Sequence, residues 1–147
     1  MTHAPLSHAP LSGVGLAGRL SRPIVVAAAG ALAVAAVVLR DPHVRGIWGV
    51  CPFLAVTGFY CPACGGLRAV NDLAHGRFAM AVDSNLLAVG MVTYAALVWS
   101  AWTVARIRGA QFAYRRWLSP AIMSGLVVTA VVFAVLRNLP AGSWLAP

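Results

Sequence analysis

Residues 51–66 read CPFLAVTGFYCPACGG, and this stretch contains all three cysteines of the chain. The longer segment from residue 46 to residue 67 contains no charged residue, so it is apolar enough to be considered for a membrane span. Residues 46–67 also contain two prolines and five glycines, residues that interrupt helices. Because irregular backbone leaves unpaired polar groups in lipid, we expect a re-entrant or interfacial loop here and not a spanning helix.

The composition of the whole chain is that of a membrane protein. The 147 residues are 61% hydrophobic and 10% charged, whereas a soluble domain has about 25% charged residues. All 11 basic residues are arginines, and the net charge is +8. These arginines flank long apolar runs and do not form a stripe on a polar face. They therefore indicate a lipid bilayer as the partner and not a nucleic acid.

Three uncharged apolar runs predict three membrane-spanning helices, at residues 23–39, 86–104 and 120–136. Each run is near the short end of the roughly 17–25 residues that cross the hydrocarbon core, and flanking arginines can reach the interface. Asp83 and Asn85 precede the second run and are expected to cap its helix. The fold class is thus an all-α integral membrane protein.

The rest of the chain is divided around these runs. Residues 1–22, in which HAPLS occurs twice, are expected to be a disordered cytoplasmic tail. A membrane domain covers residues 23–139, and its cysteine-rich loop covers residues 46–84. Residues 140–147 are expected to be a C-terminal tail. No small-residue cleavage pattern follows the first run, so we expect an uncleaved anchor.

The distribution of arginines predicts the orientation. The short linker between the second and third runs holds Arg106, Arg108, Arg115 and Arg116, and cytoplasmic loops are enriched in basic residues. We therefore expect this linker and the N-terminus on the cytoplasmic side of the cell membrane. The cysteine loop is expected on the extracytoplasmic side. Small residues in the first span would allow a homo-oligomer or another membrane protein to pack against it.

A short amphipathic helix is expected within the cysteine loop. With Cys61 as the N-cap and Pro62 in the first turn, a helix ending before Gly76 would gather polar side chains on one face. That face would hold Cys61, Cys64, Arg68, Asn71, Asp72 and His75. We expect Asp72 and His75 to form part of a solvent-exposed polar surface, and we do not expect them to assist the cysteines in catalysis.

Structural and metal-binding roles both fit the cysteines. A disulfide from Cys51 to Cys61 or Cys64, or packed thiols, would hold the loop on the helices, as is common outside the cytoplasm. Metal ligation is the second role, because CPxCG resembles a zinc knuckle. Structural zinc takes four ligands, so the three cysteines would need His43 or His75.

Redox catalysis is the third role. A thiol at a helix N-terminus and close to Arg68 would be favoured as the thiolate. The catalytic candidates are then Cys61 as nucleophile, Cys64 as the resolving thiol and Arg68, with Cys51 as a relay. The chain lacks the βαβ pattern that accompanies CxxC in thioredoxin-like enzymes.

Several spaced motifs over about residues 48–100 resemble a bacterial family of small membrane proteins known as domain of unknown function 2752. The residues that carry this resemblance are Cys51-Pro52, Thr57-Gly58, Cys61-Pro62, Cys64-Gly65, Arg68, Gly76 and Asn85. The resemblance implies a few-pass membrane protein with a cysteine-rich loop between spans, and it implies no activity. The chain departs from the family pattern at Ala63, Leu67 and Leu86, where glycine, threonine and proline are usual.

Together these observations predict a non-enzymatic multi-pass membrane protein whose CP-x8-CPxCG loop is structural or binds a ligand, without a cofactor. Two alternatives stay open. One is a membrane thiol–disulfide oxidoreductase that uses Cys61 and Cys64. The other is a Cys3His module that holds zinc or an iron–sulfur centre.

Overall fold

The computed structural model describes residues 15–147, and over this range the chain forms helices and no strands. The repeated HAPLS segment of the expected tail lies outside the described residues. In chain order the elements are α1 (Leu16–Leu39), α2 (Pro52–Thr57), α3 (Gly66–Ala74), α4 (Phe78–Ile107), α5 (Tyr114–Trp117), α6 (Pro120–Leu136) and the 3₁₀ helix η2 (Pro140–Leu145). The predicted all-α fold is confirmed.

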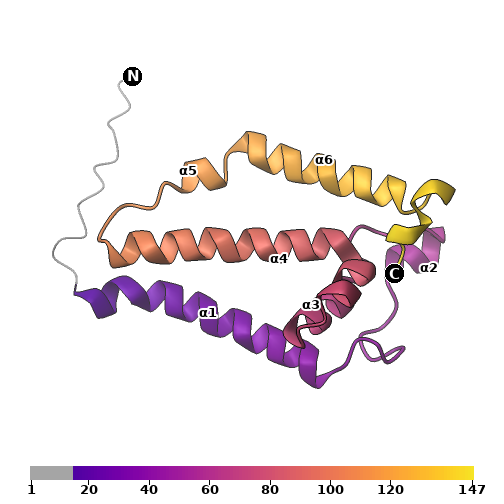
Figure 1. Cartoon of the computed structure of the whole chain (residues 1–147), viewed down its shortest axis with the longest axis horizontal. Helices are drawn as coiled ribbons and strands as arrows, with labels where there is room; N and C mark the ends of the chain where they lie inside the picture. Colours follow the sequence, from indigo (N-terminus) through magenta and orange to yellow (C-terminus); the bar gives the residue numbers. More distant parts are fainter. Residues whose placement is uncertain (1–14) are drawn as a thin grey trace.

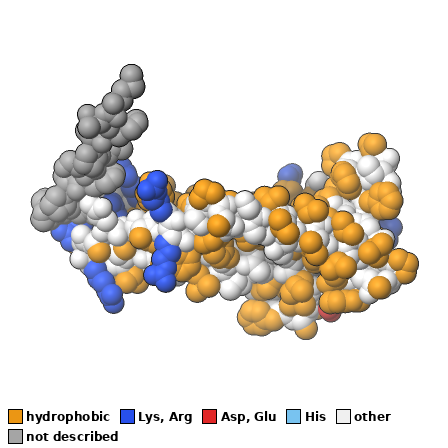
Figure 2. All heavy atoms as spheres, turned by 90° about the horizontal axis from the view of Figure 1, so that it is seen from above, with side chains coloured by type: hydrophobic (Ala, Val, Ile, Leu, Met, Phe, Trp, Pro, Cys, Tyr) orange, Lys and Arg blue, Asp and Glu red, His pale blue; other side chains and the backbone are white. Residues whose placement is uncertain are grey.

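Three helical segments are long and apolar enough to cross a membrane: Leu16–Leu39, Phe78–Ile107 and Tyr114–Leu136. The long helices α1, α4 and α6 run along the same axis, and α2, α3 and the C-terminus gather at one end (Figure 1). Hydrophobic side chains cover much of the surface seen from above (Figure 2). Arginine side chains gather at the end of the molecule that lies opposite to α2, α3 and the C-terminus (Figure 2). Large exposed apolar surfaces of this kind mark contact with a membrane or a partner. The helices are therefore suited to contact lipid.

The apolar stretch at residues 46–67 does not form a fourth span. Its longest helix is α2, which has six residues, far fewer than the roughly 17–25 that a span needs. Four glycines in it adopt positive φ, at Gly46, Gly49, Gly58 and Gly65. This backbone conformation is readily accessible only to glycine and ends a helix.

Helix α1 begins at Leu16 and not at Pro23, so residues 16–22 of the expected tail are helical. Pro23 lies inside the helix, where it has no N–H for the carbonyl of Arg19, four residues earlier. That carbonyl instead accepts a hydrogen bond of 2.9 Å from Nε of Arg106 on α4. The carbonyl of Pro23 accepts one of 3.1 Å from Nε1 of Trp99. Two side chains of α4 thus stabilise the helix around the proline.

Helix α4 is bent at Asn85, whose φ of −169° and ψ of 98° are extended and not helical. The Asn85 Oδ1 accepts a hydrogen bond of 2.8 Å from the amide of Ala88, which is the geometry of an N-cap. The expectation that Asn85 caps the second spanning helix is confirmed. Asp83, the other expected cap, has an exposed side chain.

The structure corrects the predicted start of α3. Cys61 does not cap a helix. Residues 61–65 form turns in which the amide of Cys64 donates to the carbonyl of Cys61 at 3.1 Å. The helix begins only at Gly66, because Gly65 has a left-handed φ of +80°. A helix cannot continue through that conformation, so CPxC is a separate turn.

The structure corrects the expectation of a solvated polar face on α3 for Asp72, whereas His75, the other residue expected there, is exposed. Asn71 and Asp72 are 1% and 0% exposed. Asn71 donates to the carbonyl of Val37 on α1 at 3.1 Å. Asp72 accepts from Arg77 Nε at 3.0 Å and lies 3.4 Å from His43 Nε2. These polar contacts join α3 to α1 and to the loop that follows α1.

The chain after α6 folds back on the cysteine end. Residues 140–145 form η2, and Gly142 is buried so tightly that a Cβ there would lie 2.0 Å from the carbonyl oxygen of Leu136. A Cβ on Gly65 would lie 2.2 Å from the carbonyl oxygen of Ser84 and 2.8 Å from Cβ of Pro147. The turn at residues 61–65 is therefore enclosed by α4 and by the C-terminal segment.

Replacing Gly65 by alanine should strongly destabilise this end. The substitution combines an unfavourable φ with a backbone clash, and we expect a loss of about 3 kcal/mol in the free energy of unfolding. Gly58→Ala is the matched control, because Gly58 has a φ of +72° but no atom within 4 Å of its added Cβ. The control should lose only about 1 kcal/mol. Chemical denaturation in detergent measures both, and equal losses would contradict the role of the enclosed turn.

Candidate functional site

The three cysteine side chains meet at the enclosed end of the molecule. The Sγ of Cys61 lies 3.2 Å from that of Cys64 and 3.5 Å from that of Cys51. All three sulfurs lie within 4.8 Å of one another. The thiols are free and half-buried. Each sulfur can therefore react with either of the others or share one bound ion with them.

Short local structures hold each thiol. Cys51 is the N-cap of α2, with Pro52 as the first helical residue, where the missing N–H of proline costs nothing. Its carbonyl accepts from the amide of Ala55 at 2.9 Å. The other two thiols project from the turn at residues 61–65, where the amide of Gly66 donates to the carbonyl of Ala63 at 2.8 Å.

Helix α4 fixes this turn through the side chain of Asn85. Its Nδ2 donates to the carbonyl oxygens of Pro62 at 2.9 Å and of Cys64 at 2.8 Å. Asn85 is 0% exposed, so these bonds form away from water. One buried amide therefore both caps a spanning helix and holds the cysteine turn.

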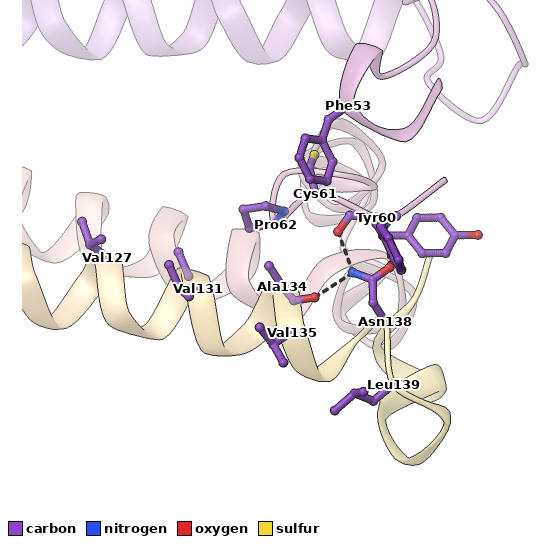
Figure 3. A pocket seen from close by; sticks show the side chains of 12 residues that line it. Phe53, Tyr60, Cys61, Pro62, Val127, Val131, Ala134, Val135, Asn138 and Leu139 are labelled. Atoms are coloured by element: carbon purple, nitrogen blue, oxygen red, sulfur yellow. Dashed lines mark hydrogen bonds between the residues drawn. The ribbon is translucent and has the colours of Figure 1, made fainter. Parts of the chain in front are cut away.

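The end of α6 fixes the same turn from the other side. Nη1 of Arg137 donates to the carbonyl oxygens of Cys61 at 2.9 Å and of Cys64 at 3.1 Å. Asn138 pairs with the backbone of Tyr60: its Oδ1 accepts from the amide, and its Nδ2 donates to the carbonyl, both at 2.8 Å. Figure 3 shows Asn138 facing Tyr60 and Ala134 from the end of α6. Residues far apart in the sequence are thus needed to shape the turn.

Arg137 is an unusual residue for this position because it is only 2% exposed. Its guanidinium carbon lies 4.8 Å from the ring centroid of Phe133 and 5.7 Å from that of Tyr60, distances typical of cation–π contacts. Its Nε and Nη2 have no hydrogen-bond partner within the described residues. Burial lowers the pKa of Arg137, whereas the neighbouring Cys64 and Cys61 thiols act to raise it.

No carboxylate neutralises Arg137. The chain has three acidic residues, all within the described part of the structure. Asp72 is paired with Arg77 at 2.9 Å, Asp41 lies 2.8 Å from His43, and Asp83 is exposed. The titratable groups near Arg137 that can become anions are the thiols of Cys64 and Cys61 and the phenol of Tyr60, and of these a thiol ordinarily loses its proton more readily than a phenol.

The thiols differ in their tendency to ionise. The backbone amide of Leu54 in the first turn of α2, followed by the Cys61 thiol, lowers the pKa of Cys51. Burial, followed by the same Cys61 thiol, raises the pKa of Cys64 to about 12. Cys51 is therefore the more readily formed thiolate of the two.

The other predicted candidates lie outside this cluster. His75 is exposed at the C-cap of α3, with its Nδ1 2.8 Å from the carbonyl oxygen of Asn71. His43 lies between Asp41 and Asp72. Over residues 15–147, the cysteine cluster contains no histidine within ligating distance. Arg68 is half-buried on α3.

Sequence reasoning missed Arg137 and Asn138 as parts of this site. Their only signal was that Arg137 follows the third apolar run, where an arginine is expected at a membrane interface. Its place beside the cysteines depends on how α6 packs.

An apolar groove of about 550 Å³ adjoins the cluster. Its wall includes Cys61 and Pro62 from the turn, Phe53 from α2, and Val131 and Val135 from α6 (Figure 3). Lipid chains can fill such a groove on a membrane-facing surface.

Comparison with known proteins agrees with the resemblance of the cysteine loop. Residues 51–99 match the model of a family described as protein of unknown function (DUF2752), which supports the assignment of the cysteine loop and the following helix to that family. No curated protein and no solved structure matches the chain.

The difference in ionisation predicts an order of alkylation. A thiol reacts as its thiolate, so a lowered pKa should let Cys51 react with iodoacetamide at a lower pH than Cys64. In metal-free, reduced protein near pH 8, we expect Cys51 to be labelled before Cys64. Peptide mass spectrometry over a pH series measures the order. Faster labelling of Cys64 than of Cys51 would contradict it.

Proposed function

We propose that the protein is a multi-pass membrane protein that binds one thiophilic metal ion through Cys51, Cys61 and Cys64. The observation that supports this best is the mutual proximity of three free Sγ atoms, all within 4.8 Å. A disulfide needs only two such atoms, whereas a shared ion explains why the third is also brought in.

The spacing of the sulfurs fits a single ion. With metal–sulfur bonds of about 2.3 Å, two thiolates on one tetrahedral ion lie roughly 3.8 Å apart. The observed separations of 3.2 and 3.5 Å are slightly shorter, and small side-chain rotations would lengthen them. In a cubane iron–sulfur cluster each cysteine binds a different iron, which requires sulfurs farther apart.

The ligand set favours Cu⁺ among the thiophilic ions. Soft thiolates select Cu⁺ and Zn²⁺, and Cu⁺ is satisfied by three of them. Zn²⁺ takes four ligands and would need a water or a partner's side chain in the open position. His75 is too far along α3 to supply it in the described arrangement.

Metal titration of the full-length protein in detergent tests this proposal. We expect one Cu⁺ per chain in competition with a chelator, and a loss of at least about a hundredfold in affinity when Cys51, Cys61 or Cys64 is replaced by serine, because each is a direct ligand. His75→Ala is the control and should bind normally. Failure to bind one ion per chain, or unchanged binding by all three serine variants, would exclude the proposed site.

A thiol–disulfide relay is the second candidate, and the central place of Cys61 favours it. Cys61 lies within 3.5 Å of both other sulfurs, so it could pair with either. In one turnover two thiols would form a disulfide, losing two electrons and two protons to a partner disulfide, which is reduced to two thiols. Intact mass after maleimide labelling separates the candidates. Labelling that requires a reductant supports the relay, whereas labelling that requires a chelator supports the metal site.

We further propose that the cysteine end of the molecule faces the extracytoplasmic side of the cell membrane. Two features support this orientation: the short linker rich in arginine and the gathering of arginines at the opposite end of the molecule (Figure 2), because basic residues favour the cytoplasmic side. Alkaline phosphatase, which is active only outside the cytoplasm, should be active when fused through a flexible linker after Pro147 and inactive when fused after Ala110. The reverse result would invert the orientation.

A further inference from the structure

We propose that Arg137 provides the counter-charge of the metal centre and thereby sets both its affinity and its preference among ions. This inference rests on the proposed function. It assigns a role to a residue whose hydrogen bonds go to backbone carbonyl oxygens of the turn and that would not ligate the ion.

The burial of Arg137 is the first step. At 2% exposure, its charge is removed from water, and buried charges are normally paired because the loss of hydration is costly. The chain has three acidic side chains, and none pairs with Arg137 in the described structure. The compensating negative charge must come from another chemical group.

The position of the guanidinium is the second step. One of its nitrogens donates to the carbonyl oxygens of both Cys61 and Cys64, which places the charge directly beside the turn that carries two of the three thiols. When the three thiols bind an ion as thiolates, the complex carries a net charge of −1 with Zn²⁺ and −2 with Cu⁺. Arg137 is the nearest buried cation to compensate for it.

The shape of the guanidinium is the third step. The planar group lies near the rings of Phe133 and Tyr60, a surrounding that suits arginine better than lysine. These rings stabilise a cation without neutralising it. The positive charge therefore remains available to a negatively charged metal complex.

Arg137→Gln tests the inference, because it keeps hydrogen-bond donors and removes the charge. Since Coulomb energy scales with the product of the charges, we expect the affinity to fall by about tenfold for Zn²⁺ and by about a hundredfold for Cu⁺. Arg137→Lys keeps the charge but not the planar group, and it should restore the wild-type ratio of the Cu⁺ and Zn²⁺ affinities and part of each affinity. Arg68→Gln, which removes a half-buried arginine near the start of α3, is the control and should bind both ions as the wild type does.

The ratio of the two affinities decides the outcome. A merely structural role would weaken both ions equally, because a loosened turn does not distinguish their charges, and a partly unfolded sample would also lower both alike. An unchanged Cu⁺ to Zn²⁺ ratio in Arg137→Gln, or no rescue by Arg137→Lys, would overturn the inference while leaving the metal site intact. If the wild type bound neither ion, the proposed function would fail and the inference with it.

Discussion

A single nitrogen of Arg137, just after α6, donates to the carbonyl oxygens of Cys61 and Cys64, and the guanidinium that carries it is buried. Because leaving a buried charge unpaired is costly, the position of this group constrains everything around it. The helix α6 ends here, and the cysteine turn presents two of its carbonyls to the guanidinium. Under the proposal made above, the thiols of the cluster supply the compensating negative charge.

Buried polar contacts join the helices of this fold, and few large apolar side chains are buried between them. The buried hydrophobic residues within the described chain are few and mostly small: Val37, Ala69, Ala81 and Phe133. In a membrane, apolar side chains gain little by leaving lipid, so helices associate through close packing and hydrogen bonds. Buried side-chain amides provide such bonds, since Asn71 joins α3 to α1 and Asn85 joins α4 to the turn. Each also satisfies a backbone carbonyl that water would otherwise have to reach.

The features that the sequence predicts correctly depend on local chemistry. Apolar length identifies the three spans, and the short polar side chain of Asn85 identifies a cap. The features that it does not predict depend on contacts between distant residues. A helical wheel places Asp72 on a solvated face, but His43 and Arg77 enclose it. The predicted cation near the thiols is Arg68, one turn away on an ideal helix, yet Gly65 ends that helix and packing brings Arg137 to the turn instead.

The proposed centre would therefore be built from two separate parts of the chain. The segment that matches the family, residues 51–99, contains the three thiols and Asn85. Arg137 and Asn138, which hold the same turn from α6, lie outside it. A complex of one metal ion with three thiolates is an anion. Residues 51–99 offer it no buried positive charge, because their only buried charged side chain is Asp72. In the proposed centre, Arg137 at the C-cap of α6 supplies that charge, which would give the third apolar helix a chemical reason to be part of the same protein as the cysteine loop.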